Sequence, residues 1–303
     1  MRKWYQWNIY YYGDMDEFIN NYLRIVIKNC KKIDDDLEWF FIRYWSGGPH
    51  IRLRINCPEE VMFCIEKIIK DQVNRVEEIN TTIWDKEEII KQQRVLAMRE
   101  KAKIPDAIFV NKSIIKDNYI PETLKYGVGL VLENSEKIFV LSSEMSLRLV
   151  SRGKFKELKY FYSIICFMKY IRLVTEYDKT NICNVYIKIW SDYIGISSNI
   201  IRRNLEDKIV IEGEKVISVL EKIEGYDRDI DEDIWDLKIS MLLEQQKRLI
   251  NCSSEYLSII FNYIHVNNNR LGITPYEEIY VALLVQYLQK MIKSIVYKLM
   301  EMI

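Results

Sequence analysis

The segment from Trp39 to Ile55 constrains the fold of this chain more than any other part of its sequence. It contains two runs rich in aromatic and β-branched residues, joined by a Ser-Gly-Gly-Pro turn at 46–49. These turn residues tolerate the dihedral angles of tight turns, so the segment predicts a β-hairpin. Because side chains alternate between the two faces of a strand, the second strand should have one apolar and one polar face.

The polar face of that second strand gathers ionisable side chains. The period of two places His50, Arg52 and Arg54 together, opposite an apolar row. Such groups repel one another on a buried face unless an anionic or strongly hydrogen-bonding group lies over them. The pattern therefore predicts a functional site, although the simpler interpretation is that the arginines face solvent.

Histidine is scarce in this chain, and both copies lie near arginine. His50 precedes Arg52 and Arg54, and His265 precedes Asn269 and Arg270. Taken alone, His265 reads as a satisfied core residue, but the shared pattern favours a site. We expect His50 and the two strand arginines to line a cleft that His265 or Arg270 also reaches.

Composition excludes several classes of function. The 303 residues carry 44 Lys and Arg against 44 Asp and Glu, which argues against general nucleic-acid binding. The N-terminus lacks the apolar core of a signal peptide, and no run approaches the roughly 18 apolar residues of a membrane helix. We therefore expect a soluble cytoplasmic protein that binds neither nucleic acid nor membrane.

The sequence gives no sign of a metal or organic cofactor. Its six cysteines form no Cys-x-x-Cys pair and have no histidine at metal-ligand spacing, so free thiols are expected. Phosphate-binding glycine loops and a Gly-x-Ser-x-Gly elbow are both missing from the sequence. We therefore expect no cofactor, no zinc site, no nucleotide chemistry and no serine-hydrolase chemistry.

The first 120 residues alternate strand and helix patterns. An aromatic strand at about 4–12 is followed by an amphipathic helix at 16–31, the hairpin, and a helix with Pro58 in its first turn. A charged helical stretch at 86–103 precedes an apolar segment at 104–119. This order predicts a mixed or antiparallel sheet with ferredoxin-like βαββα elements.

After Pro121 the periodicity is almost entirely helical. Thr274-Pro-Tyr-Glu277 is a capping box with proline at the first helical position, which predicts where the last helix begins. We expect an α+β fold and a single compact unit over 1–303, sheet-rich over about 1–120 and helical over about 121–303. Helices are predicted at 123–142, 145–150, 155–177, 184–194, 199–208, 215–223, 231–251, 254–266 and 275–302.

Three spaced motifs, taken in order, resemble one family. The first is Phe-Phe-Ile-Arg-Tyr-Trp at 40–45 with His-Ile-Arg-Leu-Arg at 50–54. The second runs from Tyr-Ile-Pro-Glu-Thr-Leu-Lys-Tyr-Gly at 119–127 to the serines at 142–143, and the third is His265 with Asn-Arg-Leu at 269–271. Together they resemble the thiopeptide-type bacteriocin biosynthesis domain family. That family comprises the small elimination domain of class I lanthipeptide dehydratases, its free-standing thiopeptide relatives, and the pyridine synthases derived from them.

The resemblance implies one of two chemistries. Elimination domains act on a peptide whose Ser or Thr carries a glutamyl ester, remove the α-proton and expel glutamate, leaving dehydroalanine or dehydrobutyrine. Pyridine synthases join two dehydroalanines of a leader-bearing precursor peptide in a formal aza-[4+2] cycloaddition, with loss of water and of the leader peptide. A third alternative is a non-catalytic scaffold that docks the precursor for other enzymes of the pathway.

Local residues favour the pyridine synthase. The resemblance places Lys125 at a position where elimination domains typically have arginine. Lysine lacks the planar guanidinium group that binds a carboxylate through two parallel hydrogen bonds. The Gly-Gly-Pro-His turn also looks more like the pyridine-synthase version, whereas the retained arginines keep elimination open. The resemblance implies that the partners include a leader-bearing precursor peptide and can include other enzymes of the same pathway. It implies no cofactor, and a homodimer is possible. The implied catalytic residues are His265, Tyr44 and His50, and the implied substrate-binding residues are Arg43, Arg52, Arg54, Lys125, Asn269 and Arg270.

Overall fold

The contacts within the chain divide it into two compact units. The structure, a computed structural model, describes residues 1–76, 86–105, 108–174, 177, 179–223 and 230–301. Met1–Glu122 and Phe139–Phe155 form the sheet unit, and Thr123–Ile138 and Lys156–Ile303 form the helical unit. The division lies near the expected change at about residue 121, except that helix α6 (Leu130–Val150) contributes to both units. That the whole chain folds as one unit stays a prediction.

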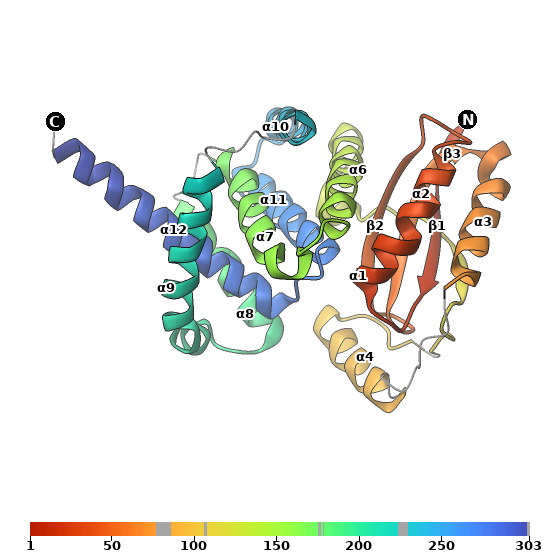
Figure 1. The fold of residues 1–303 in the computed structure, drawn as a ribbon, viewed down its shortest axis with the longest axis horizontal. Helices are drawn as coiled ribbons and strands as arrows, with labels where there is room; N and C mark the ends of the chain where they lie inside the picture. Colours follow the sequence, from red (N-terminus) through yellow and green to blue (C-terminus); the bar gives the residue numbers. More distant parts are fainter. Residues whose placement is uncertain (77–85, 106–107, 175–176, 178, 224–229, 302–303) are drawn as a thin grey trace. The chain divides into compact units, whose positions relative to one another are not determined.

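The sheet unit contains a four-stranded antiparallel sheet (Figure 1). The strand order is β2-β3-β1-β4, which is the split βαβ order of a ferredoxin-like sheet. The predicted α+β class and the ferredoxin-like start are therefore confirmed. The strands are β1 (Arg2–Tyr10), β2 (Glu38–Tyr44), β3 (His50–Pro58) and β4 (Ile114–Asn118), and the helices are α1 (Met15–Phe18), η1 (Ile19–Leu23), α2 (Arg24–Cys30), α3 (Glu59–Asn74) and α4 (Lys86–Glu100).

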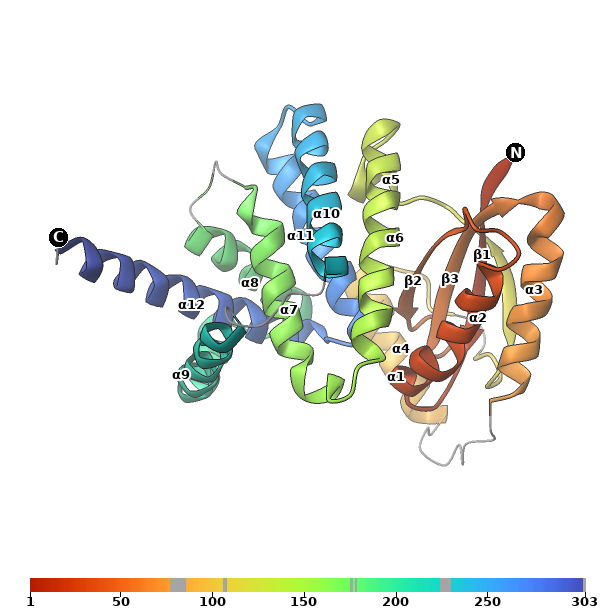
Figure 2. The same cartoon turned by 45° about the horizontal axis from the view of Figure 1, so that its top comes forward.

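Helices α1 to α3 cover the apolar face of the sheet (Figure 2). The helix expected at 16–31 begins at its Asp14 cap, whose Oδ1 accepts from the backbone N–H of Asp16 at 2.9 Å. It runs as α1, a π-helical turn and α2 rather than as one regular α-helix. The sheet side chains beneath are almost fully buried, and they include Trp7, Ile9, Phe41 and Leu53. Their burial fixes the register, because a slip by one residue would turn the arginine row inward.

The second face of the sheet carries the polar row predicted from the hairpin. In the register, His50 lies opposite Tyr10, and Arg54 lies opposite Gln6. The outer edge of β2 is closed by α6, because the backbone N–H of Phe41 donates to Ser143 Oγ at 3.2 Å. A sheet edge capped in this way cannot pair with another strand at that position.

The helical unit is built around α11 (Ser253–Arg270). The buried hydroxyl of Tyr263 donates to Gln246 Oε1 and lies within hydrogen-bond distance of Ser135 Oγ, both at 2.7 Å. These bonds hold α11 against the first part of α6 and against α10. The remaining helices are α5 (Thr123–Tyr126), α7 (Phe155–Arg172), α8 (Lys179–Ile194), α9 (Ser198–Ile223), α10 (Ile230–Leu249) and α12 (Pro275–Glu301).

The start of α12 confirms the predicted capping box. The backbone N–H of Thr274 donates to Glu277 Oε2 at 2.7 Å, and the N–H of Glu277 donates to the Thr274 hydroxyl at 3.4 Å. This reciprocal pair satisfies two donors at the helix start. It fixes the rotation of the first turn of α12 and therefore the direction of the neighbouring Glu278.

Three predicted helix boundaries are wrong. The helices expected at 199–208 and 215–223 are the single helix α9, and a Cβ on its Gly213 would meet the Tyr287 ring of α12 at 2.4 Å. Glycine there permits close packing instead of ending the helix. Conversely, the helix expected at 123–142 is broken at Gly127 and Gly129, which have φ values of +80° and +57°. The helix expected separately at 145–150 is the last part of α6, which runs without a break from Leu130 to Val150.

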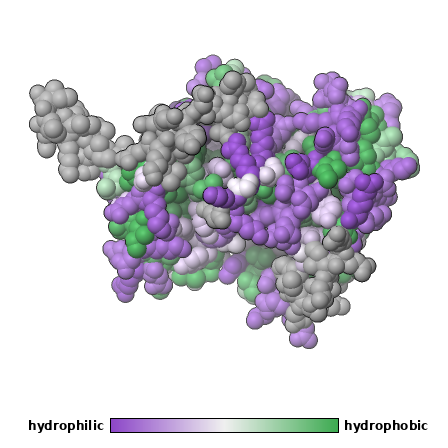
Figure 3. Space-filling view, in the orientation of Figure 1, coloured by the Kyte–Doolittle hydropathy of each residue, from purple (hydrophilic) through white to green (hydrophobic). Residues whose placement is uncertain are grey.

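None of the helices in the described ranges is long and apolar enough to cross a membrane. The surface in Figure 3 is mostly hydrophilic, and its hydrophobic side chains lie in small patches between polar ones. Small scattered apolar patches are normal on a protein surface and need no partner to cover them.

Candidate functional site

His50 is the first residue of β3 and follows the glycine turn directly. Its Nδ1 lies 2.8 Å from the carbonyl oxygen of Gly48. A carbonyl can only accept, so Nδ1 carries the ring proton and Nε2 carries a lone pair. The ring is 1% exposed, and its Nε2 has no hydrogen-bond partner among the residues that the structure describes. His50 is therefore a buried hydrogen-bond acceptor.

The surroundings of His50 keep its imidazole neutral. Burial, opposed by the bond to Gly48 and assisted by the charge of Arg52, lowers the pKa of His50 to about 4. The rings of Tyr10 and Tyr44 lie 4.5 and 5.6 Å from the imidazole. Burial raises the pKa of Tyr10 to about 12 and also raises the pKa of Tyr44. At neutral pH this group thus combines an unprotonated base with protonated hydroxyls.

The two strand arginines lie on the His50 face and contact aromatic rings. The Arg52 guanidinium carbon is 3.5 Å from the centre of the Tyr44 ring. Arg54 is 7% exposed, and its Nε donates to Gln6 Oε1 at 2.8 Å. Its guanidinium also lies 5.2 Å from the ring centre of Phe40. Stacking on aromatic rings offsets part of the cost of burying these cations.

Arg43 lies apart from this cluster. It pairs with Ile51 in the sheet register and so belongs to the opposite, helix-covered face. Its Nη2 donates to Asp16 Oδ1 of α1 at 2.5 Å, and both side chains are largely buried. Arg43 thus joins sheet to helix. Its expected contact with the substrate does not fit this placement, because the strand period turns it away from Arg52 and Arg54.

The second histidine lies in the helical unit. His265 Nδ1 on α11 is 2.7 Å from Oε1 of Glu278 on α12. The Glu278 side chain is fully buried, whereas the His265 side chain is 36% exposed. The imidazole packs against the ring of Trp190, with ring centres 4.5 Å apart. Its Nε2 has no hydrogen-bond partner among the described residues.

Glu278 receives two further hydrogen bonds. Its Oε2 accepts from the Tyr186 hydroxyl and from Asn268 Nδ2, the latter at 3.3 Å. The Oδ1 of Asn268 in turn accepts from Ser163 Oγ at 2.6 Å. Burial and the nearby carboxylate raise the pKa of Tyr186 well above its usual range, so it remains a donor. Four helices thus position one carboxylate behind one histidine.

The remaining predicted residues also lie in the helical unit. Lys125 is exposed on α5, and its carbonyl accepts from Asn262 Nδ2 of α11 at 3.2 Å. Asn269 is half-buried in the last turn of α11. Arg270 is 1% exposed, and its charge acts on the buried hydroxyl of Tyr170, where it opposes the rise in the tyrosine pKa.

Each unit therefore gathers its own group of predicted residues. His50, Tyr44, Arg52 and Arg54 come together on the sheet, whereas His265, Lys125, Asn269 and Arg270 belong to the helical unit. That the two histidines share one cleft stays a prediction. The residues that sequence reasoning missed are Tyr10, Glu278, Tyr186, Asn268 and Trp190.

A signal for Glu278 was present in the sequence. Val281, Ala282 and Val285 follow it at the spacing of one helix face, and all four residues are fully buried. A carboxylate on an apolar helix stripe requires a partner, because an unpaired buried charge is costly. His265 is that partner.

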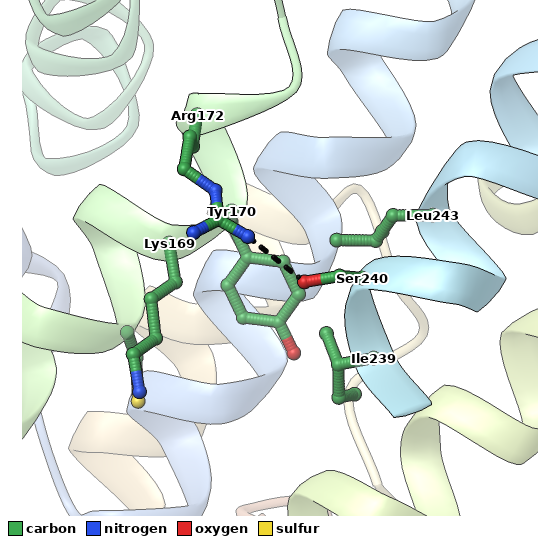
Figure 4. Close-up of a pocket in the computed structure, with 7 residues that line it drawn as sticks. Lys169, Tyr170, Arg172, Ile239, Ser240 and Leu243 are labelled. Carbon is green, nitrogen blue, oxygen red and sulfur yellow. Dashed lines mark hydrogen bonds between the residues drawn. The ribbon is translucent and has the colours of Figure 1, made fainter. Parts of the chain in front are cut away.

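A small hollow lies elsewhere in the helical unit, between α7 and α10 (Figure 4). It encloses about 340 Å³, part of it open to solvent. Arg172 donates to Ser240 Oγ across it at 3.1 Å, and the buried Tyr170 hydroxyl has no partner among the residues placed in the structure. Such a space suits ordered water. The residues that line it are Cys166, Lys169, Tyr170, Arg172, Ile239, Ser240 and Leu243, and neither histidine is among them.

With this geometry in place, comparison with known proteins identifies the family. The family model described as lantibiotic biosynthesis dehydratase C-term matches residues 4–288. The chain belongs to this family. Membership confirms the resemblance carried by the three motifs. The comparison with curated proteins finds no match.

Solved structures of similar fold include members of thiopeptide and lantibiotic pathways. The pyridine synthase TbtD from thiomuracin biosynthesis matches with a TM-score of 0.72 at 14% identity, over 94% of this chain and 97% of that one. The tRNA-dependent lantibiotic dehydratase MibB from Microbispora sp. 107891 matches with a TM-score of 0.59 at 15% identity, over 96% of this chain and 28% of that one. TsrL matches with a TM-score of 0.60 at 10% identity, over 96% and 95%. At these identities the likeness shows a shared fold.

Proposed function

We propose that this family member is a thiopeptide pyridine synthase. Its substrate would be a leader-bearing precursor peptide with two dehydroalanines. One amide of the peptide, held as its imidic-acid tautomer, supplies an azadiene that adds to the second dehydroalanine. Loss of water and of the leader as its amide then gives the pyridine ring that closes the macrocycle. Other enzymes of the pathway would make the dehydroalanines.

The observation that carries this proposal is the composition of the His50 face. It combines an imidazole whose pKa is about 4 with tyrosine hydroxyls whose pKa values are raised. The imidic-acid form of an amide is favoured when one group accepts a hydrogen bond from its N–H and another donates a hydrogen bond to its oxygen. A neutral imidazole beside protonated hydroxyls supplies both functions near pH 7, on a substrate that carries no charge at the reacting atoms.

Two further observations support the same branch. The match to the pyridine synthase has a TM-score of 0.72, against 0.59 for the dehydratase. Lys125, the residue at the expected arginine position, lies exposed on a four-residue helix. A lysine there offers a carboxylate a point charge, not a bidentate fork. Capture of a glutamate leaving group is correspondingly weaker.

Glutamate elimination is the second candidate, and the arginine row favours it. Arg52 and Arg54 are two residues apart on one strand face, and a guanidinium stacked on a ring keeps its in-plane N–H donors. These donors could bind the glutamyl carboxylate while a histidine removes the α-proton. The C–H electron pair would then form the new double bond as glutamate leaves as its anion.

One experiment separates the candidates. The purified protein is incubated with a leader-bearing peptide that contains two dehydroalanines and, separately, with a glutamylated peptide, and both products are weighed by mass spectrometry. A pyridine synthase converts the first to a product lighter by water and the leader amide, and leaves the second unchanged. Release of glutamate without heterocycle formation would identify an eliminase. Binding of both peptides without reaction would identify a scaffold.

A further inference from the structure

The carboxylate of Glu278, which lies beside His265, is held by three neighbouring side chains. Its side chain is 0% exposed and is bound by His265, Tyr186 and Asn268. Within the described ranges, no lysine or arginine bonds to it. Two of its three donors are uncharged, since the raised pKa of Tyr186 keeps that hydroxyl protonated. A protonated His265 is therefore the one cation among these partners that can balance the buried charge.

The two nitrogens of His265 are placed for different tasks. An ionised carboxylate accepts hydrogen bonds and donates none, so Nδ1 carries the proton in the 2.7 Å bond to Glu278. Nε2 then presents a lone pair on a side chain that is 36% exposed. Trp190 packs against the ring and limits its rotation. A histidine with a purely structural role would be expected to use both nitrogens inside the core.

We propose that Glu278 is a positioning residue that makes His265 Nε2 the proton acceptor of the reaction. This inference rests on the proposed function and adds Glu278 to it. When water is lost from the cycloadduct, a ring C–H proton passes to Nε2 and the C–H electron pair becomes the new double bond. The C–O bond breaks, and the departing hydroxyl takes that proton back from Nε2 as water. Glu278 balances the imidazolium between the two transfers.

The hydrogen bonds to Glu278 from other side chains also fix its carboxylate relative to His265. Tyr186 and Asn268 both donate to Oε2, which leaves Oε1 for His265. Asn268 is oriented by the Ser163 hydroxyl at 2.6 Å. A carboxylate with each oxygen committed in this way cannot rotate away from the imidazole without losing two hydrogen bonds. Catalytic histidines depend on this kind of fixed orientation.

The first test needs no substrate. The chain has only two histidines, so ¹⁵N-histidine labelling gives the ring signals of His50 and His265 alone. At a pH where the rings are neutral, His265 in the full chain should carry its proton on Nδ1, and Glu278→Gln should weaken that preference. The His265→Asn spectrum assigns the signals. A wild-type His265 with its proton on Nε2 would overturn the inference.

The second test measures turnover of the dehydroalanine peptide by the full-length protein. Glu278→Gln should lower kcat by roughly 10²–10⁴-fold with KM nearly unchanged, as expected when a catalytic histidine loses its carboxylate. Glu277→Gln is the matched control, because it removes one charge from the same helix turn and bonds to Thr274, Lys159 and Tyr160 instead. Its kcat should stay within about threefold, since glutamine also suits a capping box.

The outcomes separate this inference from the proposed function. Wild-type turnover by Glu278→Gln would refute the positioning role and leave the pyridine synthase intact. Glutamate elimination by the wild type, together with the expected tautomer and an equal loss in Glu278→Gln, would refute the pyridine synthase but retain the positioning role. Equal losses in Glu277→Gln and Glu278→Gln would indicate a general effect on α12 and overturn the inference.

Discussion

The two histidines of this chain are anchored by the same atom to different acceptors. His50 donates from Nδ1 to a backbone carbonyl on the sheet, whereas Nδ1 of His265 lies 2.7 Å from a buried carboxylate between helices. The His50 ring is 1% exposed beside a cation, and the His265 side chain is 36% exposed beside Trp190. In the proposed arrangement both rings carry a proton on Nδ1, but the acceptor is an uncharged carbonyl for His50 and a carboxylate for His265.

That difference assigns different tasks to them. A carbonyl offers no negative charge to offset a proton, and burial near Arg52 lowers the pKa of His50 to about 4. His50 is suited to accept a hydrogen bond while remaining neutral. The carboxylate behind His265 can balance an imidazolium, so this histidine is suited to hold a proton between two steps. We expect His265 to transfer protons and His50 to orient an amide.

The largest expected effect is the loss of the His265 ring. His265→Ala should lower kcat by roughly 10²–10⁴-fold, the usual contribution of a general acid–base group. His50→Asn keeps a donor near the Gly48 carbonyl and should cost only about tenfold, the value of one hydrogen bond. Single-turnover rates with the dehydroalanine peptide measure both. Equal losses, or a larger loss for His50→Asn, would contradict the division of tasks.

The next effect is on stability and comes from His50. Its folded pKa of about 4 lies below the unfolded value of about 6.5, so the unfolded chain binds more protons between these values. Stability from this group is complete above pH 6.5 and is lost as the pH falls towards 4. Between pH 7.5 and 5 the loss should be about 2 kcal/mol. Urea unfolding at the two pH values measures it.

The matched variant isolates the contribution of His50 from those of other groups. The asparagine of His50→Asn cannot titrate. Between pH 7.5 and 5 the free energy of unfolding of this variant should therefore fall by about 2 kcal/mol less than that of the wild type. Tyr10 and Tyr44, which face the ring, have raised pKa values and stay protonated throughout this range. The same pH slope in both proteins would show that the buried environment of His50 does not depress its pKa.

Much of the sheet could be predicted from the sequence, because short-range patterns determine it. The Gly-Gly-Pro turn and the alternation of the second strand fix which side chains share a face, and the structure places His50, Arg52 and Arg54 together as predicted. The same rule, applied to the first strand, separates Arg43 from them. The position of Arg43 in a motif suggested that it binds substrate. Its ion pair with Asp16 could not be predicted from the sequence, because that contact depends on how α1 packs against the sheet.

The helical site could be predicted only in part, because it depends on packing between distant segments. His265 stood out by its rarity, but its partner Glu278 lies on another helix, and Tyr186 is 92 residues away from Glu278 in sequence. Helix boundaries failed for a related reason. Gly213 lies between the helices expected at 199–208 and 215–223, and its close contact with the Tyr287 ring is visible only in the folded chain. Local patterns do not contain these contacts.

A smaller effect is expected from the arginine that stacks beside His50. Arg52→Lys keeps the charge but loses the planar contact 3.5 Å from the Tyr44 ring, and KM for the peptide should rise roughly 2–30-fold. Arg43→Lys on the opposite face is the control and should leave KM within about twofold. Steady-state kinetics test the pair. An equal rise of KM in both variants would mean that substrate binding does not depend on which face of the sheet carries the arginine.

The smallest expected effect is that of removing divalent metals. A carboxylate behind the Nδ1 of a histidine is also the arrangement found behind metal-ligating histidines, so His265 Nε2 could in principle hold a metal. Zinc requires further ligands, and no group of three His, Cys, Asp or Glu suited to a metal occurs in the described part of the chain. Cyclisation should therefore proceed at an unchanged rate after treatment with a chelator. If activity disappeared with the chelator and returned with zinc, His265 would be a metal ligand, whereas His50 would remain a hydrogen-bond acceptor. Glu278 would then orient the metal ligand instead of balancing the charge of a protonated histidine.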